Sequence, residues 1–167
     1  MKKQFIIILF LSIVVVGHVW AAGSCVQTAV NQPGGACLIK FVCTGDAGGG
    51  SIPNTVISAD KMSLVNDGNH YLYTVSAYPT AGGTAPDAAD VFILDTNGED
   101  LLGSADGGTT AKNGLNLIHA TLKKTTFPYS TYLGQAYFPA ITNNLTLKVS
   151  NQATNSANYT IELLFVR

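Results

Sequence analysis

Three cysteines, all within the first 43 residues, are the side chains of this sequence with the clearest chemical potential. On one continuous strand, Cys37 and Cys43 would lie about 20 Å apart at roughly 3.3 Å per residue, whereas a disulfide needs Cα atoms within about 7 Å. A hairpin centred on Gly34, in the turn Gln32-Pro33-Gly34-Gly35, instead places Cys25 opposite Cys43. We therefore predict a Cys25–Cys43 disulfide and a buried free thiol at Cys37.

Cys25 also has a second interpretation. The run Ala21-Ala22-Gly23-Ser24 places small residues before it, as at the sites where bacterial lipoproteins are cleaved and acylated. The leucine usually found three residues before such a cysteine is replaced here by Ala22. Anchoring to a membrane through a lipid on Cys25 therefore stays open beside the disulfide.

An acidic run in the middle of the chain is the next candidate for chemistry. Asp95, Asn97 and Glu99 alternate as oxygen ligands, and with Asp106 at the twelfth position they resemble a calcium-binding loop. The sixth position of such a loop needs glycine for its sharp turn, and here it is Asp100. We therefore favour a hairpin turn capped by Asp95 over a calcium site. The whole run comprises Asp87, Asp90, Asp95, Asn97, Glu99, Asp100 and Asp106.

Catalytic chemistry has little support in the sequence. Outside the N-terminal segment there are two histidines, His70 and His119, and neither lies in a nucleophile motif such as Gly-x-Ser-x-Gly. The cysteines lack the Cys-x-x-Cys spacing of a zinc site. The glycine runs Gly48–Gly50 and Gly107–Gly108 precede no helix with Lys-Ser/Thr, so they predict flexible turns and no phosphate-binding loop. We expect no enzymatic activity and no cofactor.

Tyrosines supply one further candidate surface. Flat aromatic rings stack on sugars, although tyrosine in strands more often packs in the core or at its rim. The residues that could line a carbohydrate-binding face are Tyr71, Tyr73, Tyr78, Tyr129, Tyr132 and Tyr137.

The elements that must position these residues are strands, and the clearest signal lies at the end of the chain. Apolar and polar residues alternate there in two runs, on either side of the polar segment Asn151–Asn158. We interpret the two runs as a β-hairpin with one buried face, which needs a second sheet to cover it. The apolar positions are Leu145, Leu147 and Val149 in the first run and Tyr159, Ile161, Leu163 and Phe165 in the second.

Upstream, further short apolar runs alternate with turn signals. With only 11% charged residues, about seven to nine short strands predict an all-β fold, a single antiparallel β-sandwich over residues 23–167. On the strand Tyr71–Tyr78 we expect Tyr71, Tyr73, Val75 and Ala77 to share one face. The other expected strands are Ala36–Thr44, Asp90–Asp95, Asn116–Lys123 and Ser130–Phe138, and a helix turn is the alternative for Asn116–Lys123. We also expect a tight turn at Asn97-Gly98 and an irregular edge element at Ser51–Ser58 that Lys61–Val65 continues.

Residues 1–22 predict a signal peptide. Lys2 and Lys3 precede the apolar run Phe5–Val16, and Val19-Trp20-Ala21 suits a signal peptidase. An uncleaved anchor is the alternative, disfavoured because a spanning helix needs roughly 20 apolar residues. Cleavage leaves seven Lys+Arg against ten Asp+Glu, a formal charge of −3. We expect an exported protein, periplasmic, extracellular or envelope-anchored in a bacterium, that does not bind nucleic acid.

Three pairs of segments resemble small β-rich structural and accessory proteins of tailed phages and prophages. They are Phe41–Ala47 with Ser51–Thr55, Thr84–Asp87 with Asp90–Gly103, and Ile141–Asn144 with Asn155–Ala157. The resemblance covers most of residues 36–167 and implies a virion-type structural role without catalytic residues. The export signal and the cysteine-bearing hairpin depart from the group, as does Lys112–Tyr129. An envelope-associated or secreted relative with the same fold fits equally well.

From these features we expect a non-enzymatic, exported structural or interaction protein, envelope-associated or a phage-derived virion-type component. Its expected partners are other proteins or further copies of itself, with membrane contact limited to the signal or a lipid on Cys25. The alternative is a solute- or glycan-binding module at the cell surface or in the periplasm.

Overall fold

Antiparallel strands carry the fold in the computed structural model, which describes residues 22–66, 69–102, 115–128, 130–132 and 135–167. They are β1 (Ser24–Asn31), β2 (Cys37–Thr44), β3 (Thr55–Val56), β4 (Tyr71–Pro79), β5 (Ala89–Leu94), β6 (Leu115–Ile118), β7 (Lys124–Thr126), β8 (Ser130–Tyr132), β9 (Gln135–Tyr137), β10 (Thr146–Ser150) and β11 (Asn158–Val166). A 3-10 turn, η1 (Pro33–Gly35), and a short helix, α2 (Ala59–Met62), complete the described elements.

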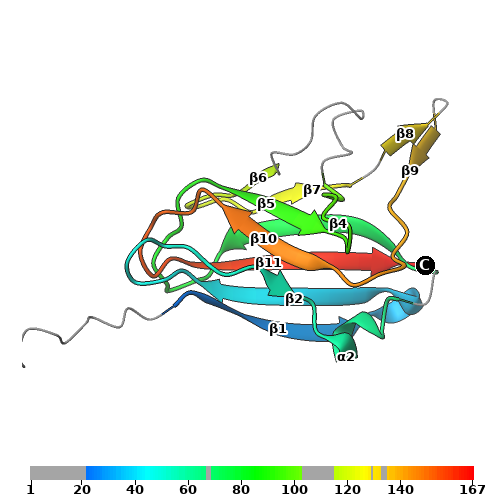
Figure 1. The fold of residues 1–167 in the computed structure, drawn as a ribbon, viewed down its shortest axis with the longest axis horizontal. Coiled ribbons are helices and arrows are strands. Elements are labelled where there is room, and N and C mark those ends of the chain that lie inside the picture. Colours follow the sequence, from blue (N-terminus) through cyan, green and yellow to red (C-terminus); the bar gives the residue numbers. More distant parts are fainter. Residues whose placement is uncertain (1–21, 67–68, 103–114, 129, 133–134) are drawn as a thin grey trace, which may run out of the picture.

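Two sheets stack as a sandwich (Figure 1). One has five strands in the order β1-β2-β11-β4-β7, and the other has four in the order β3-β10-β5-β6. The strands β8 and β9 pair with each other and project from the sandwich (Figure 1). The predicted all-β fold with antiparallel sheets is confirmed.

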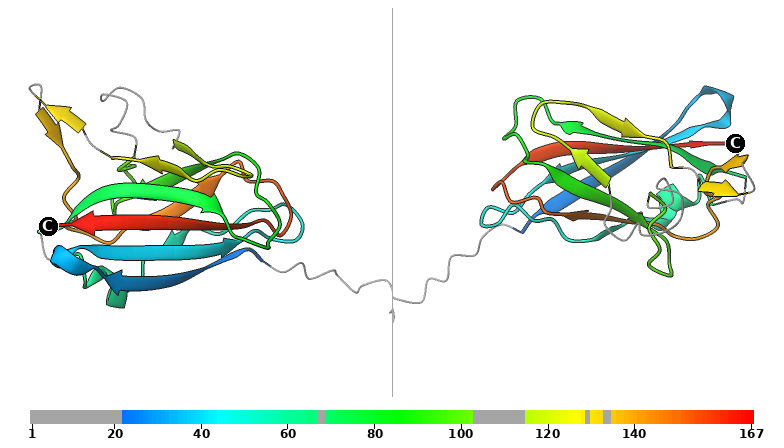
Figure 2. Two further views of the ribbon diagram at one scale, coloured as in Figure 1. Left: turned by 180° about the vertical axis from the view of Figure 1, so that it is seen from behind. Right: turned by 90° about the horizontal axis from the view of Figure 1, so that it is seen from above.

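One continuous hydrophobic core fills the space between the two sheets, whose layers Figure 2 shows from behind and from above. Strands β2 and β11 contribute every second residue to it, as the pleat of a half-buried strand requires. The four-stranded sheet covers these residues with side chains from β5 and β10. The principal core residues are Cys37, Ile39, Phe41, Cys43, Tyr159, Ile161, Leu163 and Phe165 from the first sheet and Val91, Ile93 and Leu147 from the second.

The last two long strands do not form the predicted hairpin. Strand β10 pairs with β3 and β5, whereas β11 pairs with β2 and β4, so the chain crosses between sheets after Ser150. The crossing uses left-handed backbone at Asn151 (φ 66°) and Ser156 (φ 52°). Buried Gln152 fixes it, because its side chain accepts from the Asp87 N–H and donates to the Thr154 carbonyl. Alternation marks an inward face in both arrangements, so it does not distinguish paired strands from stacked ones.

The inward face of β4 also differs from the prediction. Leu72 is fully buried together with Val75 and Ala77, while Tyr71 is 40% exposed. Leu164 and Phe165, which are successive residues of β11, pair with Thr74 and Leu72 of β4. Tyr73 therefore has no partner in this ladder and forms a β-bulge. The bulge shifts the side-chain alternation by one residue, which moves Leu72 onto the core side.

Three further segments were assigned wrongly from the sequence. Lys61–Val65 does not continue the edge strand β3, because the chain turns into α2 and then into a turn. The strand expected at Asn116–Lys123 ends at Ile118, and Ser130–Phe138 contains two short strands, β8 and β9, in place of one. Short apolar runs carry too little periodicity to locate such breaks. The predicted signal peptide lies mostly outside the described residues, of which 22 is the first.

Candidate functional site

The hairpin of β1, η1 and β2 holds the first candidate site. Its register pairs Cys25 with Cys43, Val26 with Val42 and Val30 with Leu38, as predicted. The Cys25 and Cys43 sulfurs are bonded at 1.98 Å, and their Cα atoms are 4.0 Å apart. The Cys25 sulfur therefore cannot carry a lipid while the disulfide is intact. Cys37 is a buried free thiol, and burial raises its pKa.

The calcium candidates are arranged as a turn. Both oxygens of the Asp95 carboxylate accept hydrogen bonds, Oδ1 from the backbone N–H groups of Asn97 and Glu99 and Oδ2 from the Asn97 side-chain amide. Gly98 donates to the Asp95 carbonyl, which closes the turn. Asp106 lies outside the described residues. Within the described part of the chain, no group of three or more His, Cys, Asp or Glu side chains is placed to hold a metal ion.

Other carboxylates cap backbone N–H groups in the same way. Asp46 accepts from the N–H groups of Gly48 and Gly49, and Asp87 accepts from that of Ala153 in the crossing between β10 and β11. Asp100 turns inward and accepts from the N–H groups of Ile93 and Leu102. Burial raises the pKa of Asp100 despite these two bonds. The sequence signal for the Asp46 cap is the pair of glycines two and three residues later, although the same glycines also fit the flexible turn predicted at Gly48–Gly50.

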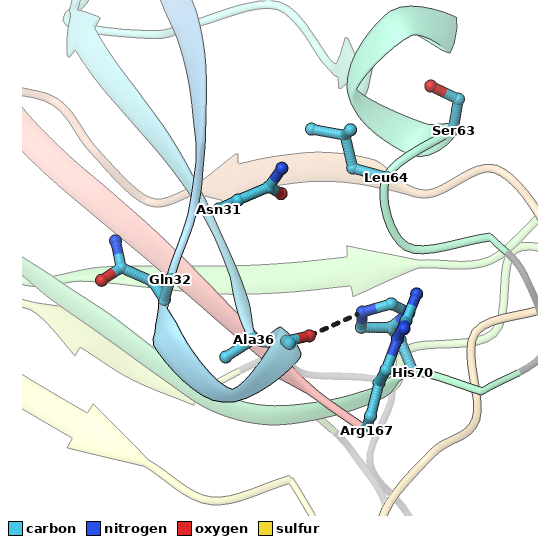
Figure 3. Close-up of a pocket in the computed structure, with 8 residues that line it drawn as sticks. Asn31, Gln32, Ala36, Ser63, Leu64, His70 and Arg167 are labelled. Carbon is cyan, nitrogen blue, oxygen red and sulfur yellow. Dashed lines mark hydrogen bonds between the residues drawn. The ribbon is translucent and has the colours of Figure 1, made fainter.

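A polar pocket of about 400 Å³ opens at the end of the sandwich that holds the C-terminus (Figure 3). His70 is buried beside it, and its Nε2 donates to the Gly35 carbonyl at 3.1 Å. The other histidine, His119, lies elsewhere and caps a turn by accepting from the N–H groups of Thr121 and Leu122. The pocket therefore contains an imidazole but no cysteine or carboxylate side chain beside it. Its lining residues are Asn31, Gln32, Gly35, Ala36, Ser63, Leu64, His70 and Arg167.

The tyrosines predicted to line a carbohydrate-binding face do not lie together. The Tyr78 hydroxyl donates to Glu162 at 2.7 Å, beneath the Lys123 ammonium, which is 4.9 Å from the ring centre. Burial, and then the Glu162 carboxylate, raise the pKa of Tyr78 to about 12. Tyr73 lies at the other end of β4 and contacts Phe127 and Phe138, with ring centroids 5.6 and 5.2 Å away. The sequence reasoning missed both phenylalanines. Tyr129 and the side chains of Tyr132 and Tyr137 lie outside the description.

The outward side of the five-stranded sheet, which we call the outer face, carries two mainly apolar rows separated by a polar row. On its β1 and β2 strands, Val26, Val30 and Val42 are 66%, 54% and 37% exposed. The strand registers define the rows as Val26-Val42-Thr160-Tyr78, Thr28-Lys40-Glu162-Ser76 and Val30-Leu38-Leu164-Thr74. The exposed part of this face lies on β1 and β2, because Thr160 and Ser76 are buried. Val26 and Val42 are directly opposite each other, and Val30 lies on the far side of the Thr28–Lys40 pair. We call these three valines the valine patch.

The outer face ends at the unpaired edge of β1. Among the described residues, β2 is the only strand that pairs with β1, which lies at the end of the sheet order. The short Cα separation of Cys25 and Cys43 marks a non-hydrogen-bonded pair, so the backbone groups of Cys25, Gln27 and Ala29 point away from β2. The eight residues of β1 include no charge and no proline. The charges and prolines that commonly protect edge strands are thus absent from β1.

Comparisons of this chain with protein-family models, with curated proteins and with solved structures found no match.

Proposed function

We propose that this chain is an exported, non-enzymatic structural or interaction protein that works through protein–protein contact at its outer face. The observation that carries the proposal is the patch of Val26, Val30 and Val42 on the β1–β2 hairpin. Burying exposed valine side chains against a partner is favourable by about 25 cal/mol per Å² of apolar surface. The charged side chains of the face, Lys40 and Glu162, lie on β2 and β11, and β1 itself carries no charge.

Export is supported by the disulfide and by the N-terminal sequence. A Cys25–Cys43 bond persists in an oxidising compartment and is rare in a reducing cytoplasm. No described helix has the length and apolarity needed to cross a membrane. The resemblance of the sequence to phage structural proteins favours an envelope-associated or virion-type component.

The proposal is tested by site-specific photocross-linking in the producing cell. A benzophenone amino acid replaces Val42 on the outer face, and in a matched control it replaces Thr96 in the exposed turn after β5. We expect a discrete protein adduct from position 42, identified by mass spectrometry in an extracytoplasmic fraction, and none from position 96. Equal labelling from both positions, or an intact leader with the protein in the cytoplasm, contradicts the proposal.

A second candidate function is glycan binding, favoured by the aromatic cluster of Tyr73, Phe127 and Phe138. Phe127 is 47% exposed, and Tyr71, two residues before Tyr73, is 40% exposed. A glycan that stacks on this cluster would raise the melting temperature of the protein. The shift should disappear in Phe127→Ala. If no member of a glycan panel shifts the melting temperature, this candidate fails and the protein-contact proposal is unaffected.

A further inference from the structure

We propose that the partner at the edge of β1 is a second copy of this chain, joined antiparallel about a two-fold axis at Thr28. This inference rests on the proposed function, because it names one partner and the contact that the two chains make. It joins two five-stranded sheets into one continuous sheet.

The first argument is the pattern of free backbone groups. Cys25, Gln27 and Ala29 direct their N–H and C=O groups to the open edge, so a partner strand must align its own outward groups with these. Pairing about Thr28 places Gln27 opposite Ala29 of the other copy, and both members of that pair have outward groups. Such a pair exchanges two N–H···O bonds. A shift of the register by one residue would break this match.

The second argument is the side-chain pairing on the outer face. About Thr28, Val26 of each copy lies opposite Val30 of the other, and the two Thr28 side chains face each other. Pairing about Gln27 or Ala29 would also align the backbone groups, but it would place each of these valines opposite a polar side chain. Side chains directly opposite each other on one face of an antiparallel pair are in contact, so two valines can pack together there. The Thr28 register therefore extends the apolar rows across the junction.

The third argument is charge. A residue on a two-fold axis faces its own copy, so a charge at position 28 would face a like charge. The strand has none. The nearest charge in the central row is Lys40, one strand away, and the two Lys40 residues would lie about three strand spacings, roughly 14 Å, apart. That distance exceeds the Debye length of about 8 Å at physiological salt.

The disulfide holds the β1 edge in an ordered conformation before a partner binds. It ties Cys25 of β1 to Cys43 of β2, so the strand does not have to be ordered when the partner arrives. A preordered edge loses less conformational entropy on association than a frayed one. Gln27 anchors the same strand to the second sheet through hydrogen bonds to Val56 and Ser58.

Sedimentation velocity of the purified exported protein tests the self-pairing. We expect a reversible dimer that Thr28→Lys and Thr28→Glu each weaken by about tenfold or more, because like charges meet at the axis. An equimolar mixture of the two variants should regain the dimer, and Thr28→Ser should behave as the wild type. A monomer at every concentration, or a Thr28→Lys protein that dimerises normally, overturns the proposal.

Cysteine cross-linking tests the register independently of affinity. Thr28→Cys should form a disulfide-linked dimer on oxidation, since opposite residues of a non-hydrogen-bonded pair lie about 4.5 Å apart. Val26→Cys and Val30→Cys should each fail alone and cross-link when mixed. Cys37 does not compete, because it is buried. Cross-linking of Val26→Cys with itself contradicts the register.

The two proposals fail in distinguishable ways. A monomer whose position 42 still photolabels another protein overturns only the β1 pairing. A dimer with the expected β1 cross-links, but without any adduct from position 42, counts instead against contact through the outer face.

Discussion

The side chain of Gln27 joins the edges of the two sheets at Val56. Its Nε2 donates to the Val56 carbonyl at 2.7 Å, and its Oε1 accepts from the Ser58 N–H at 3.0 Å. A side-chain amide has a donor group and an acceptor, as a peptide group does. The Gln27 amide therefore makes the two hydrogen bonds to Val56 and Ser58 that the backbone of a neighbouring strand could otherwise make. The Gln27 side chain thus links the edge strand β1 to the segment that follows β3.

Replacing Gln27 should open that side. Gln27→Ala removes two hydrogen bonds and should lower the free energy of unfolding by about 2 kcal/mol, measured by urea denaturation. Gln27→Glu keeps an acceptor for Ser58 but directs a carboxylate at the Val56 carbonyl, so it should be destabilising at neutral pH and recover on acidification. Thr96→Ala, in an exposed turn, serves as the control and should change stability by less than about 0.5 kcal/mol. A Gln27→Ala protein as stable as that control would show that the bridge contributes nothing.

The Cys25–Cys43 disulfide should contribute to the free energy of unfolding by an amount similar to the Gln27 hydrogen bonds. Its cysteines are 18 residues apart, and a closed loop of that length stabilises a fold by about 3 kcal/mol in the chain-entropy model. The double variant Cys25→Ala/Cys43→Ala should lose that amount in urea denaturation, and it leaves neither cysteine of the bond unpaired. A reductant should destabilise the wild type to a similar extent and leave the double variant unchanged. If the reductant affects both equally, its action is not on this bond.

The β1–β2 register was predictable because several local signals agree. Pro33 and two glycines with positive φ, Gly34 (79°) and Gly35 (80°), make the turn where only glycine is comfortable. The alternation along β2 then identifies its inward face, and the pairing of Cys25 with Cys43 follows from counting residues outward from the turn.

The crossing between β10 and β11 was not predictable on the same grounds. Both strands alternate cleanly, but the partner of each is far away in sequence, β5 for β10 and β2 for β11. Pairing of that kind is decided by the packed core and by Gln152 in the connection. The bulge at Tyr73 has a similar cause, because it is set by how β11 runs beside β4.

The candidate surface escaped sequence reasoning for a related reason. Val26 and Val30 look like core residues in a sequence, and only the sheet order shows that they face outward on an edge strand. The acidic run resembles a metal site in the sequence because carboxylates are metal ligands. Asp95 and Asp46 instead satisfy backbone N–H groups, a role that depends on turn geometry.

Asp46 should make the protein sensitive to acid. Hydrogen bonds from the Ser51 hydroxyl, and then from the Gly49 and Gly48 N–H groups, lower the pKa of Asp46 from 3.8 to about 2. Because the pKa is lower in the folded state, the stabilisation is complete above the unfolded-state pKa near 3.8 and is lost as the pH falls toward 2. Denaturation across pH 2–6 should show Asp46→Asn losing stability relative to wild type above pH 4, with the difference shrinking below it.

Ser51→Ala provides the matched test of that cause. Removing the hydroxyl that donates to Asp46 should raise the pKa of its carboxyl, followed by NMR titration of the Asp46 carboxyl carbon. The acid limb of the stability curve should move to higher pH with it. An unchanged Asp46 titration in Ser51→Ala would mean that the glycine N–H groups alone hold the pKa down.

Removing the hydroxyl of Tyr159 and removing that of Tyr78 should change the free energy of unfolding in opposite directions. Tyr159 is fully buried, and among the described residues its hydroxyl has no hydrogen-bond partner, while burial raises its pKa. Tyr159→Phe should therefore raise the free energy of unfolding by up to about 1 kcal/mol, because a desolvated donor is removed. Tyr78→Phe loses the bond to Glu162 and should cost about 1 kcal/mol. Urea denaturation of the two variants side by side decides the matter, since a loss of stability in Tyr159→Phe would require a partner for that hydroxyl, such as a buried water held in the core.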